Sequence, residues 1–271
     1  MPEPLAPRLP KALLICIGVC AALLILFWVR AQTAVSGKSS TYDEPMHALG
    51  AWVHRHHGDF RINYEDPPLW HYWAALANGK DAIHADFNSP KWTLMASQWE
   101  QQWHWTHEVL YRTPENDGEG FVQRSRSMMI VIGVALGAVL AWWGWQIGGP
   151  AAAVGAVVLF SLDPNFLAHS ALVKNDVPIS LCMLLLSLAV WRAGRRVTPW
   201  NLAGIAVACA AAMTTKFTGV VLAPVCLALL LGIRALMPVE WPVFKWTFRL
   251  WWQRLLVAGG VGLVAAVVSY V

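Results

Sequence analysis

Apolar runs of membrane-spanning length constrain this chain more than any other feature. A helix needs about 20 mostly apolar residues to cross a bilayer. The sequence is 57% hydrophobic and only 13% charged, whereas a soluble domain carries about 25% charged residues. Seven runs are candidates, in chain order 13–29, 128–147, 151–167, 177–191, 202–213, 220–236 and 255–271, of which the fourth and the fifth are short. We therefore predict an all-α fold, a polytopic membrane bundle of about seven spans.

The first run is interpreted as a retained span over residues 12–29. Its apolar core is longer than the roughly 7–15 residues of a signal peptide, and no clear small-x-small cleavage site follows it. A long polar loop over 30–127 then precedes spans two to seven in 128–271. The sequence stops inside an apolar run, so we expect residues 1–271 to form one membrane module that is truncated at its C-terminus.

Lysine and arginine in the short loops predict the orientation, because such residues accumulate on the cytoplasmic side. They precede the first span, follow the fourth, and lie between the sixth and seventh; they are Arg8, Lys11, Arg192, Arg195, Arg196, Arg234, Lys245, Arg249 and Arg254. With the N-terminus in the cytoplasm, seven spans place the remaining polar segments on the outer face. The compact loops favour a bacterial inner membrane, with these segments in the periplasm.

The polar loop is expected to form amphipathic juxtamembrane helices. Met46, Leu49 and Val53 recur at helical spacing, and Thr41 with Glu44 fits a capping box at the helix start. Seven of the seventeen tryptophans lie in this loop, which suggests that it rests on the membrane or binds a flat ligand. The other ten lie near span ends, as in an aromatic belt. No motif indicates a nucleic-acid partner, and no cysteine lies in this loop to form a disulfide.

Several polar residues are candidates for chemistry at the outer ends of the spans. Asp43 and Glu44 can serve as a general base or as a plain helix cap. Asp66 and Tyr64 lie beside the rigid Pro67–Pro68 turn. The remaining candidates are Asp176 at the head of a span, Lys216 at the end of another, and the histidines His47, His71 and His169. Interface capping and lysine snorkelling remain open alternatives.

Histidine content keeps a metal site open. Eight of the nine histidines lie in the polar loop, and His104 and His107 fall on one helix face. Zinc sites use such spacing, but no cysteine joins them, so we expect no metal or other cofactor.

The order of four motifs resembles the GT-C glycosyltransferases, in the branch of protein O-mannosyltransferases and lipid A aminoarabinose transferases. The motifs are "YDEPMHALGAWVHRHHGDF", "YEDPPLWHYWAALA", "LDPNFLAHSALVKNDVPISL" and "AMTTKFTGVVLAP". Such enzymes transfer a sugar from a polyprenyl-phosphate carrier to a protein, lipid or glycan acceptor on the outer face. The resemblance therefore implies a lipid-linked sugar donor, such an acceptor and the bilayer as partners.

The resemblance also implies roles for individual residues. Asp43 matches the catalytic carboxylate and Glu44 its usual neighbour, while Asp176 matches the second acidic position. Lys216 is similar to the lysine that bridges those acids. Substrate contacts are expected from His47, Tyr64, Asp66, His71 and His169, with Asp66 standing where the family usually has a cation before its proline pair.

Three other functions are compatible with the same residues. A metal at Asp43 would indicate an oligosaccharyltransferase-like enzyme. Asp176 and Lys216 could instead line a transport pathway. A protein that binds the lipid carrier without transferring the sugar is the third alternative.

Overall fold

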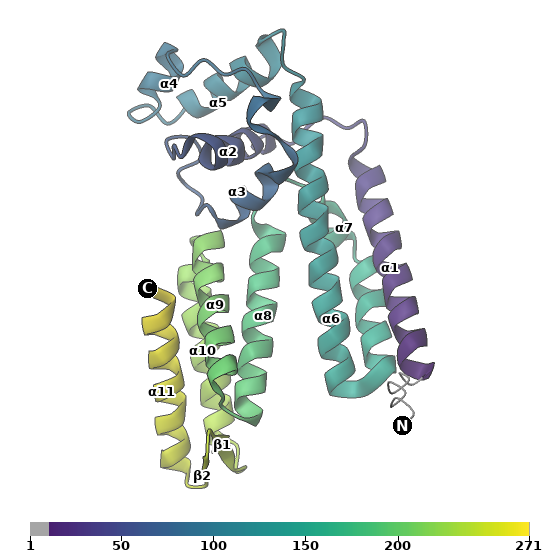
Figure 1. Ribbon diagram of the computed structural model, residues 1–271, viewed down its shortest axis with the longest axis vertical. Coiled ribbons are helices and arrows are strands. Elements are labelled where there is room, and N and C mark those ends of the chain that lie inside the picture. Colours follow the sequence, from purple (N-terminus) through teal and green to yellow (C-terminus); the bar gives the residue numbers. More distant parts are fainter. Residues whose placement is uncertain (1–10, 271) are drawn as a thin grey trace, which may run out of the picture.

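The computed structural model describes residues 11–270, which form two helical groups beneath a compact polar segment (Figure 1). The first group contains α1 (Lys11–Val35), α6 (Gly118–Leu162) and the short α7 (Pro164–Ser170). The second contains α8 (Asp176–Arg195), α9 (Pro199–Thr215), α10 (Gly219–Leu236) and α11 (Trp251–Tyr270). This all-α architecture agrees with the prediction, apart from one small hairpin.

Helix α6 consists of two arms that turn back on each other. Its backbone leaves the helical region at Gly148 and Gly149, and Gly149 has φ +68° and ψ −156°, a conformation essentially restricted to glycine. The arms pack closely, because a Cβ on Gly137 would lie 2.8 Å from the Phe160 ring. A tight turn at Gly148 and Gly149 therefore separates the two arms, and it lies at the end of the molecule opposite the polar segment (Figure 1).

Five described helices are long and apolar enough to cross a membrane: α1, α6, α8, α10 and α11. This is consistent with a multi-pass membrane protein. The two runs predicted at 128–147 and 151–167 fall mainly within α6, and the fifth run falls within α9, which has 17 residues.

The polar segment between α1 and α6 folds as short helices. They are α2 (Glu44–His57), α3 (Leu69–Ala74), η1 (Ala75–Ala77), η2 (Lys80–Ala82), α4 (Pro90–Leu94), α5 (Gln101–His107) and the π-helical η3 (Glu108–Arg112). Helix α2 ends at Gly58, whose left-handed φ of 64° suits glycine at a helix C-terminus. Short helices are therefore present in this segment as predicted, but most of α2 is buried, so this helix is not amphipathic.

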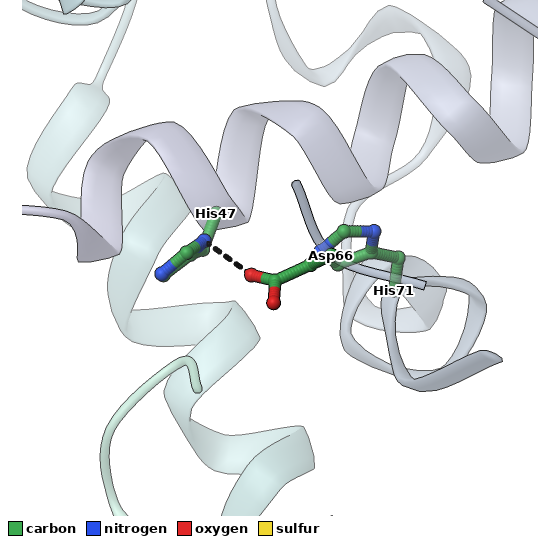
Figure 2. Close-up of side chains that lie close together, drawn as sticks. All are labelled: His47, Asp66 and His71. Atoms are coloured by element: carbon green, nitrogen blue, oxygen red, sulfur yellow. Dashed lines mark ion pairs between the residues drawn. The ribbon is translucent and has the colours of Figure 1, made fainter. Parts of the chain in front are cut away.

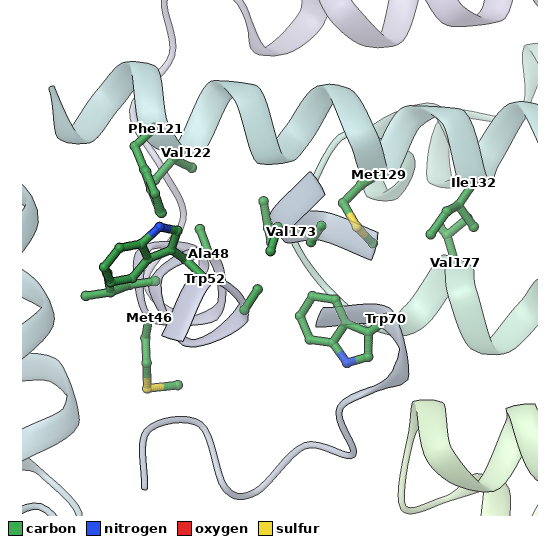
Figure 3. Close-up of a cluster of buried hydrophobic side chains, with 14 of the residues drawn as sticks. Met46, Ala48, Trp52, Trp70, Phe121, Val122, Met129, Ile132, Val173 and Val177 are labelled. Carbon is green, nitrogen blue, oxygen red and sulfur yellow. The ribbon is translucent and has the colours of Figure 1, made fainter. Parts of the chain in front are cut away.

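Buried tryptophans form much of the core of this segment. Trp52 and Trp70 pack beneath Phe121 and Met129 of α6 (Figure 3), and Trp92 and Trp105 are buried further along the segment. In a helix, apolar residues recur every three or four positions, and this spacing is the same whether the apolar side faces lipid or a protein core. Four of the seven tryptophans that suggested contact of this segment with a membrane or a flat ligand therefore pack in the protein core.

Two predicted boundaries differ from the structure. The polar loop was expected to reach residue 127, but α6 begins at Gly118, where Asp117 caps it by accepting from Gly120 N. The third span was expected to reach residue 167, but Asp163 ends α6 and caps α7 through the amides of Asn165 and Phe166. Capping by Asp117 therefore starts the helix in the polar sequence before its apolar run, and capping by Asp163 ends α6 before the apolar run ends.

A two-stranded antiparallel hairpin, β1 (Trp241–Val243) and β2 (Trp246–Phe248), lies between α10 and α11. The sequence analysis did not predict it. Trp241 anchors the hairpin, because this residue is fully buried and its indole N–H donates to the Ala193 carbonyl of α8 at 2.8 Å.

Candidate functional site

Three consecutive residues at the start of α8, Lys174, Asn175 and Asp176, contact side chains of the polar segment and of α9. Lys174 pairs with Asp43 at 3.0 Å, and Asn175 donates to Asp66 at 2.6 Å. Asp176 pairs with Lys216 at the end of α9. Consecutive Cα atoms are about 3.8 Å apart, so all three contacts arise within about two residue steps. The contacts of Asp43, Asp66 and Lys216 thus all involve one short segment, residues 174–176, at the start of α8.

Asp43 lies at the first turn of α2 but does not cap it, because its side chain accepts no backbone hydrogen bond there. Its carboxylate instead lies 3.5 Å from His47 Nε2 and 3.0 Å from Lys174 Nζ, with a third of the side chain exposed. The contact with His47 lowers the pKa of Asp43 most; partial burial opposes this and Lys174 reinforces it. The carboxylate is therefore ionised at neutral pH and accessible to solvent.

A buried hydrogen-bond chain runs from His47 away from Asp43. His47 Nδ1 contacts Asn63 Oδ1 at 2.9 Å, and Asn63 Nδ2 contacts His71 Nε2 at 2.6 Å. His71 Nδ1 contacts His54 Nδ1 at 2.9 Å, and His54 Nε2 contacts the Ile62 carbonyl at 2.8 Å. Asn63 stands at the centre, fully buried, with a φ of 54° that asparagine tolerates better than most residues.

The Ile62 carbonyl determines the direction of every hydrogen bond in this chain. A carbonyl only accepts, so His54 carries its proton on Nε2. Burial lowers the pKa of both His54 and His71, which keeps these rings neutral near pH 7. His71 must then donate from Nδ1 and accept at Nε2, and Asn63 must accept from His47 Nδ1. The Nε2 atom of His47 is therefore the one directed at Asp43.

Asp66 flanks His47 on its other side. The Asp66 carboxylate lies 3.6 Å from His47 Nδ1 (Figure 2) and accepts from Asn175. The imidazole of His47 is thus placed between two carboxylates, Asp43 and Asp66.

Glu44 is fully buried and forms a hub that fixes the backbone beside Asp43. Its carboxylate accepts from Arg126 Nε at 3.0 Å and Nη2 at 2.6 Å, from the Thr41 amide at 2.7 Å and from the Val173 amide at 3.0 Å. Burial favours a raised pKa for Glu44, but these donors outweigh it and the pKa is lowered. The Thr41 contact is the one predicted from the capping box.

Arg126 extends the hub to the end of α1. Its guanidinium, also buried, donates to the carbonyls of Lys38 at 3.0 Å and Ser39 at 3.2 Å. Because every Glu44 lone pair direction is occupied by a donor, this carboxylate has no free access to a substrate in this arrangement. Its geometry is that of a positioning residue for Asp43.

An apolar cavity of about 510 Å³ adjoins the cluster, between α3, α6, α8 and α9. Its wall includes Trp70, whose ring lies 5.6 Å from that of His47. It also includes Pro178 and Thr215, close in sequence to Asp176 and Lys216. Leu69, Tyr72, Trp73 and Leu76 form much of the rest. The polar cluster therefore lies at the side of a groove suited to a hydrocarbon chain.

His47, Asp66 and His71 have the spacing of a metal site, with donor atoms within 4.8 Å of one another. Two nitrogens and one carboxylate oxygen match the donor types of zinc. Both imidazoles, however, are hydrogen-bonded through the Asn63 amide that lies between them. A metal ion would have to displace this amide. His104 and His107, the predicted pair, do not belong to such a group among residues 11–270.

Two predicted site residues make no recorded polar contact with the cluster. Tyr64 and His169 are both exposed. The sequence analysis did not select Lys174, Asn63 and Arg126 as site residues. Lys174 lies two residues before Asp176 in one of the quoted motifs, so its position in the sequence could have indicated a role at the site. Nothing in the sequence marks Asn63 or Arg126.

Comparison with protein-family models, with curated proteins and with solved structures found no match to this chain.

Proposed function

We propose that the protein is a membrane glycosyltransferase that moves a sugar from a polyprenyl-phosphate carrier to an acceptor, with inversion at the anomeric carbon. The observation that carries this proposal is Asp43, an ionised and partly exposed carboxylate that caps nothing and is held by His47 and Lys174. Asp43 is the general base, which takes the proton from the acceptor as the acceptor attacks the sugar.

His47 and Lys174 lower the pKa of Asp43, and a low pKa means low proton affinity. Asp43 is therefore a weak base in the resting protein. Lys174 is the adjustable partner, because it is a flexible side chain and partly exposed. When a donor phosphate draws Lys174 away, Asp43 loses a cation and its pKa rises. Donor binding and activation of the base are thereby linked.

The carrier lipid occupies the apolar cavity beside the cluster. Lys216 lies at the end of α9 next to Thr215 of the cavity wall, and it meets the departing phosphate by leaving Asp176. Arg55 also lines the cavity, but it lies twelve residues from Asp43 along α2, about 18 Å at 1.5 Å per residue. Arg55 is therefore too distant to contact the phosphate at the reacting carbon.

The same proposal includes seven membrane crossings. The two arms of α6 cross separately and α9 crosses between α8 and α10, in addition to α1, α8, α10 and α11. Cations gather at the end opposite the Asp43 cluster, which supports a cytoplasmic placement for that end. The cluster then faces the periplasm of a bacterial inner membrane. The acceptor is a protein, lipid or glycan on that side.

The proposal is tested with Asp43→Asn, which keeps the side-chain volume and removes the charge. We expect transfer from a polyprenyl-phosphate sugar to fall at least about a hundredfold, as for loss of a general base, with unchanged expression and melting temperature. Asp81→Asn is the matched control, because Asp81 is an exposed carboxylate of the same segment with no recorded contact. Equal turnover by Asp43→Asn and the control would exclude Asp43 as the base.

A metal-dependent transferase is the second candidate, supported by the His47, Asp66 and His71 group. Titration of purified protein with zinc, read by calorimetry, distinguishes the two. Binding that His71→Gln abolishes, together with activity that a chelator removes, would favour the metal-dependent mechanism. Activity that is unchanged by the chelator supports the metal-free one.

A further inference from the structure

A second cavity, of about 600 Å³, lies at the end of the molecule opposite the Asp43 cluster. It is enclosed by the first arm of α6, by α8 and α10, and by the link to β1, where the two helical groups of Figure 1 face each other. Its volume is within the range of about 300–1,000 Å³ that is typical of ligand sites. The proposed sugar transfer makes no use of this cavity.

The polar groups of the cavity wall are mainly positive. Arg195 lies over the Trp191 ring at 5.1 Å and has no carboxylate or other acceptor among residues 11–270. Arg234 donates to the carbonyls of Gly194 and Glu240, so its charge remains uncompensated by an acid. Glu240 is the acid of the wall, and its carboxylate is already paired with Arg249 at 2.8 Å. The cavity therefore has an excess of positive charge.

One hydrogen-bond donor of the cavity wall, an indole N–H, is closed off from the cavity space. The indole N–H of Trp143 is buried and has no acceptor among the described residues, although Trp143 contributes to the cavity wall. A buried donor without a partner is costly. The exposed guanidinium of Arg195 is therefore the free donor that matches a ligand with anionic oxygen acceptors.

The rest of the wall is apolar. Val190, Leu230, Ile233 and Met237 line it, and Ile233 and Met237 are also exposed on the outside of the helices. An apolar surface of this kind at the end of membrane-crossing helices accommodates an acyl chain. The cavity thus combines a cationic end with a hydrocarbon-binding wall.

We propose that this cavity binds a glycerophospholipid with a net negative headgroup, such as phosphatidylglycerol. Its phosphate contacts Arg195, and one acyl chain lies along Leu230 and Ile233. Basic pockets between membrane helices bind anionic headgroups for the same electrostatic reason. The lipid fills the space between the helical groups, so it stabilises their relative position. This role is independent of the proposed sugar transfer.

The test is native mass spectrometry of the full chain purified in mild detergent and incubated with phosphatidylglycerol or phosphatidylethanolamine. We expect phosphatidylglycerol to be retained preferentially. Arg195→Gln should weaken its binding by about fivefold or more, and Ile233→Trp should block it by filling the cavity. Lys245→Gln is the matched control, since Lys245 is an exposed cation at the same end and outside the cavity wall.

Equal retention of the two lipids, or unchanged phosphatidylglycerol binding by both Arg195→Gln and Ile233→Trp, would overturn the proposal. If Arg195→Gln and Lys245→Gln weaken binding equally, the attraction is a general surface charge effect, and the cavity is not the site. Loss of sugar transfer in Asp43→Asn with normal lipid retention separates this inference from the proposed function.

Discussion

Asn63 determines which nitrogen of His47 faces Asp43. A free histidine interconverts between two tautomers, and each presents a different atom to its neighbours. Here the Ile62 carbonyl, two neutral imidazoles and the Asn63 amide allow one sequence of donors and acceptors. The ring next to Asp43 is therefore fixed in orientation, with Nδ1 donating to Asn63 and Nε2 facing Asp43, by a residue that does not itself touch Asp43.

The buried histidines predict a pH dependence of stability. Burial lowers the folded-state pKa of His54 and His71, while the unfolded chain titrates near pH 6.5. As the pH falls below about 6.5, the unfolded chain binds protons that the folded protein does not, so the unfolding free energy decreases. We expect a fall of at most about 1.4 kcal/mol per pH unit for each histidine, measured as melting by tryptophan fluorescence between pH 7.5 and 5.

Asn63→Asp tests the same chain with the opposite sign. A carboxylate next to His71 favours the charged ring, so the pKa of His71 rises and the loss of stability at low pH becomes smaller. The variant should be less stable than the parent protein at pH 7.5 and closer to it at pH 5. Parallel pH profiles for the two proteins would show that His71 does not titrate as described.

At the scale of elements, the Glu44–Arg126 ion pair connects α1, α2, α6 and the segment before α8. The two side chains are buried together, and Glu44 also binds Val173. The segment that carries Lys174 is therefore tied to the helix that begins beside Asp43. Mutual placement of Asp43 and Lys174 depends on a pair of residues that contact neither solvent nor the proposed substrate.

Glu44→Gln should therefore act through stability. It leaves the Arg126 charge buried without a counterion, and removing one partner of a buried pair costs about 3–5 kcal/mol. Denaturant or thermal unfolding in detergent measures this loss. Glu240→Gln, at the exposed Arg249 pair, is the control and should cost less than about 1 kcal/mol. Comparable small losses in both variants would contradict a structural hub at Glu44.

Local patterns predicted the elements better than they predicted the contacts between them. The glycine turn within α6 and the Thr41–Glu44 contact follow from short-range chemistry, so both could be read from the sequence. The Val173–Glu44 contact joins residues 129 positions apart, and no local rule specifies it. Asn63 was missed for the same reason, since its importance depends on three histidines that meet only in the folded chain.

At the scale of the whole molecule, the number of crossings determines which side each loop occupies. Seven crossings put residues 81 and 245 on opposite sides of the membrane. If α6 alone counted as one crossing, or if α9 alone did not cross, the two positions would share a side, whereas five crossings would again place them on opposite sides. The five native cysteines lie in helices, and replacing them leaves a background for single labels.

Labelling with a membrane-impermeant maleimide distinguishes seven crossings from an arrangement in which α6 alone or α9 alone changes the count. In the cysteine-free background, Asp81→Cys should react in intact spheroplasts, and Lys245→Cys only after the membrane is permeabilised. Both side chains are exposed, so access depends on topology and not on burial. Labelling of both positions from the same side would rule out the seven-crossing arrangement.

The buried Glu44 pair also has a consequence for biogenesis. Glu44 leaves the ribosome long before its partners, because Arg126 follows 82 residues later and Val173 follows 129 residues later. Until then the polar segment lacks the contacts that fix Asp43. The segment therefore reaches its final form only after the α6 turn and α7 have been synthesised and inserted. A ribosome stalled before Val173 should display a translocated but incompletely closed segment, which a protease added from the outer side would cleave.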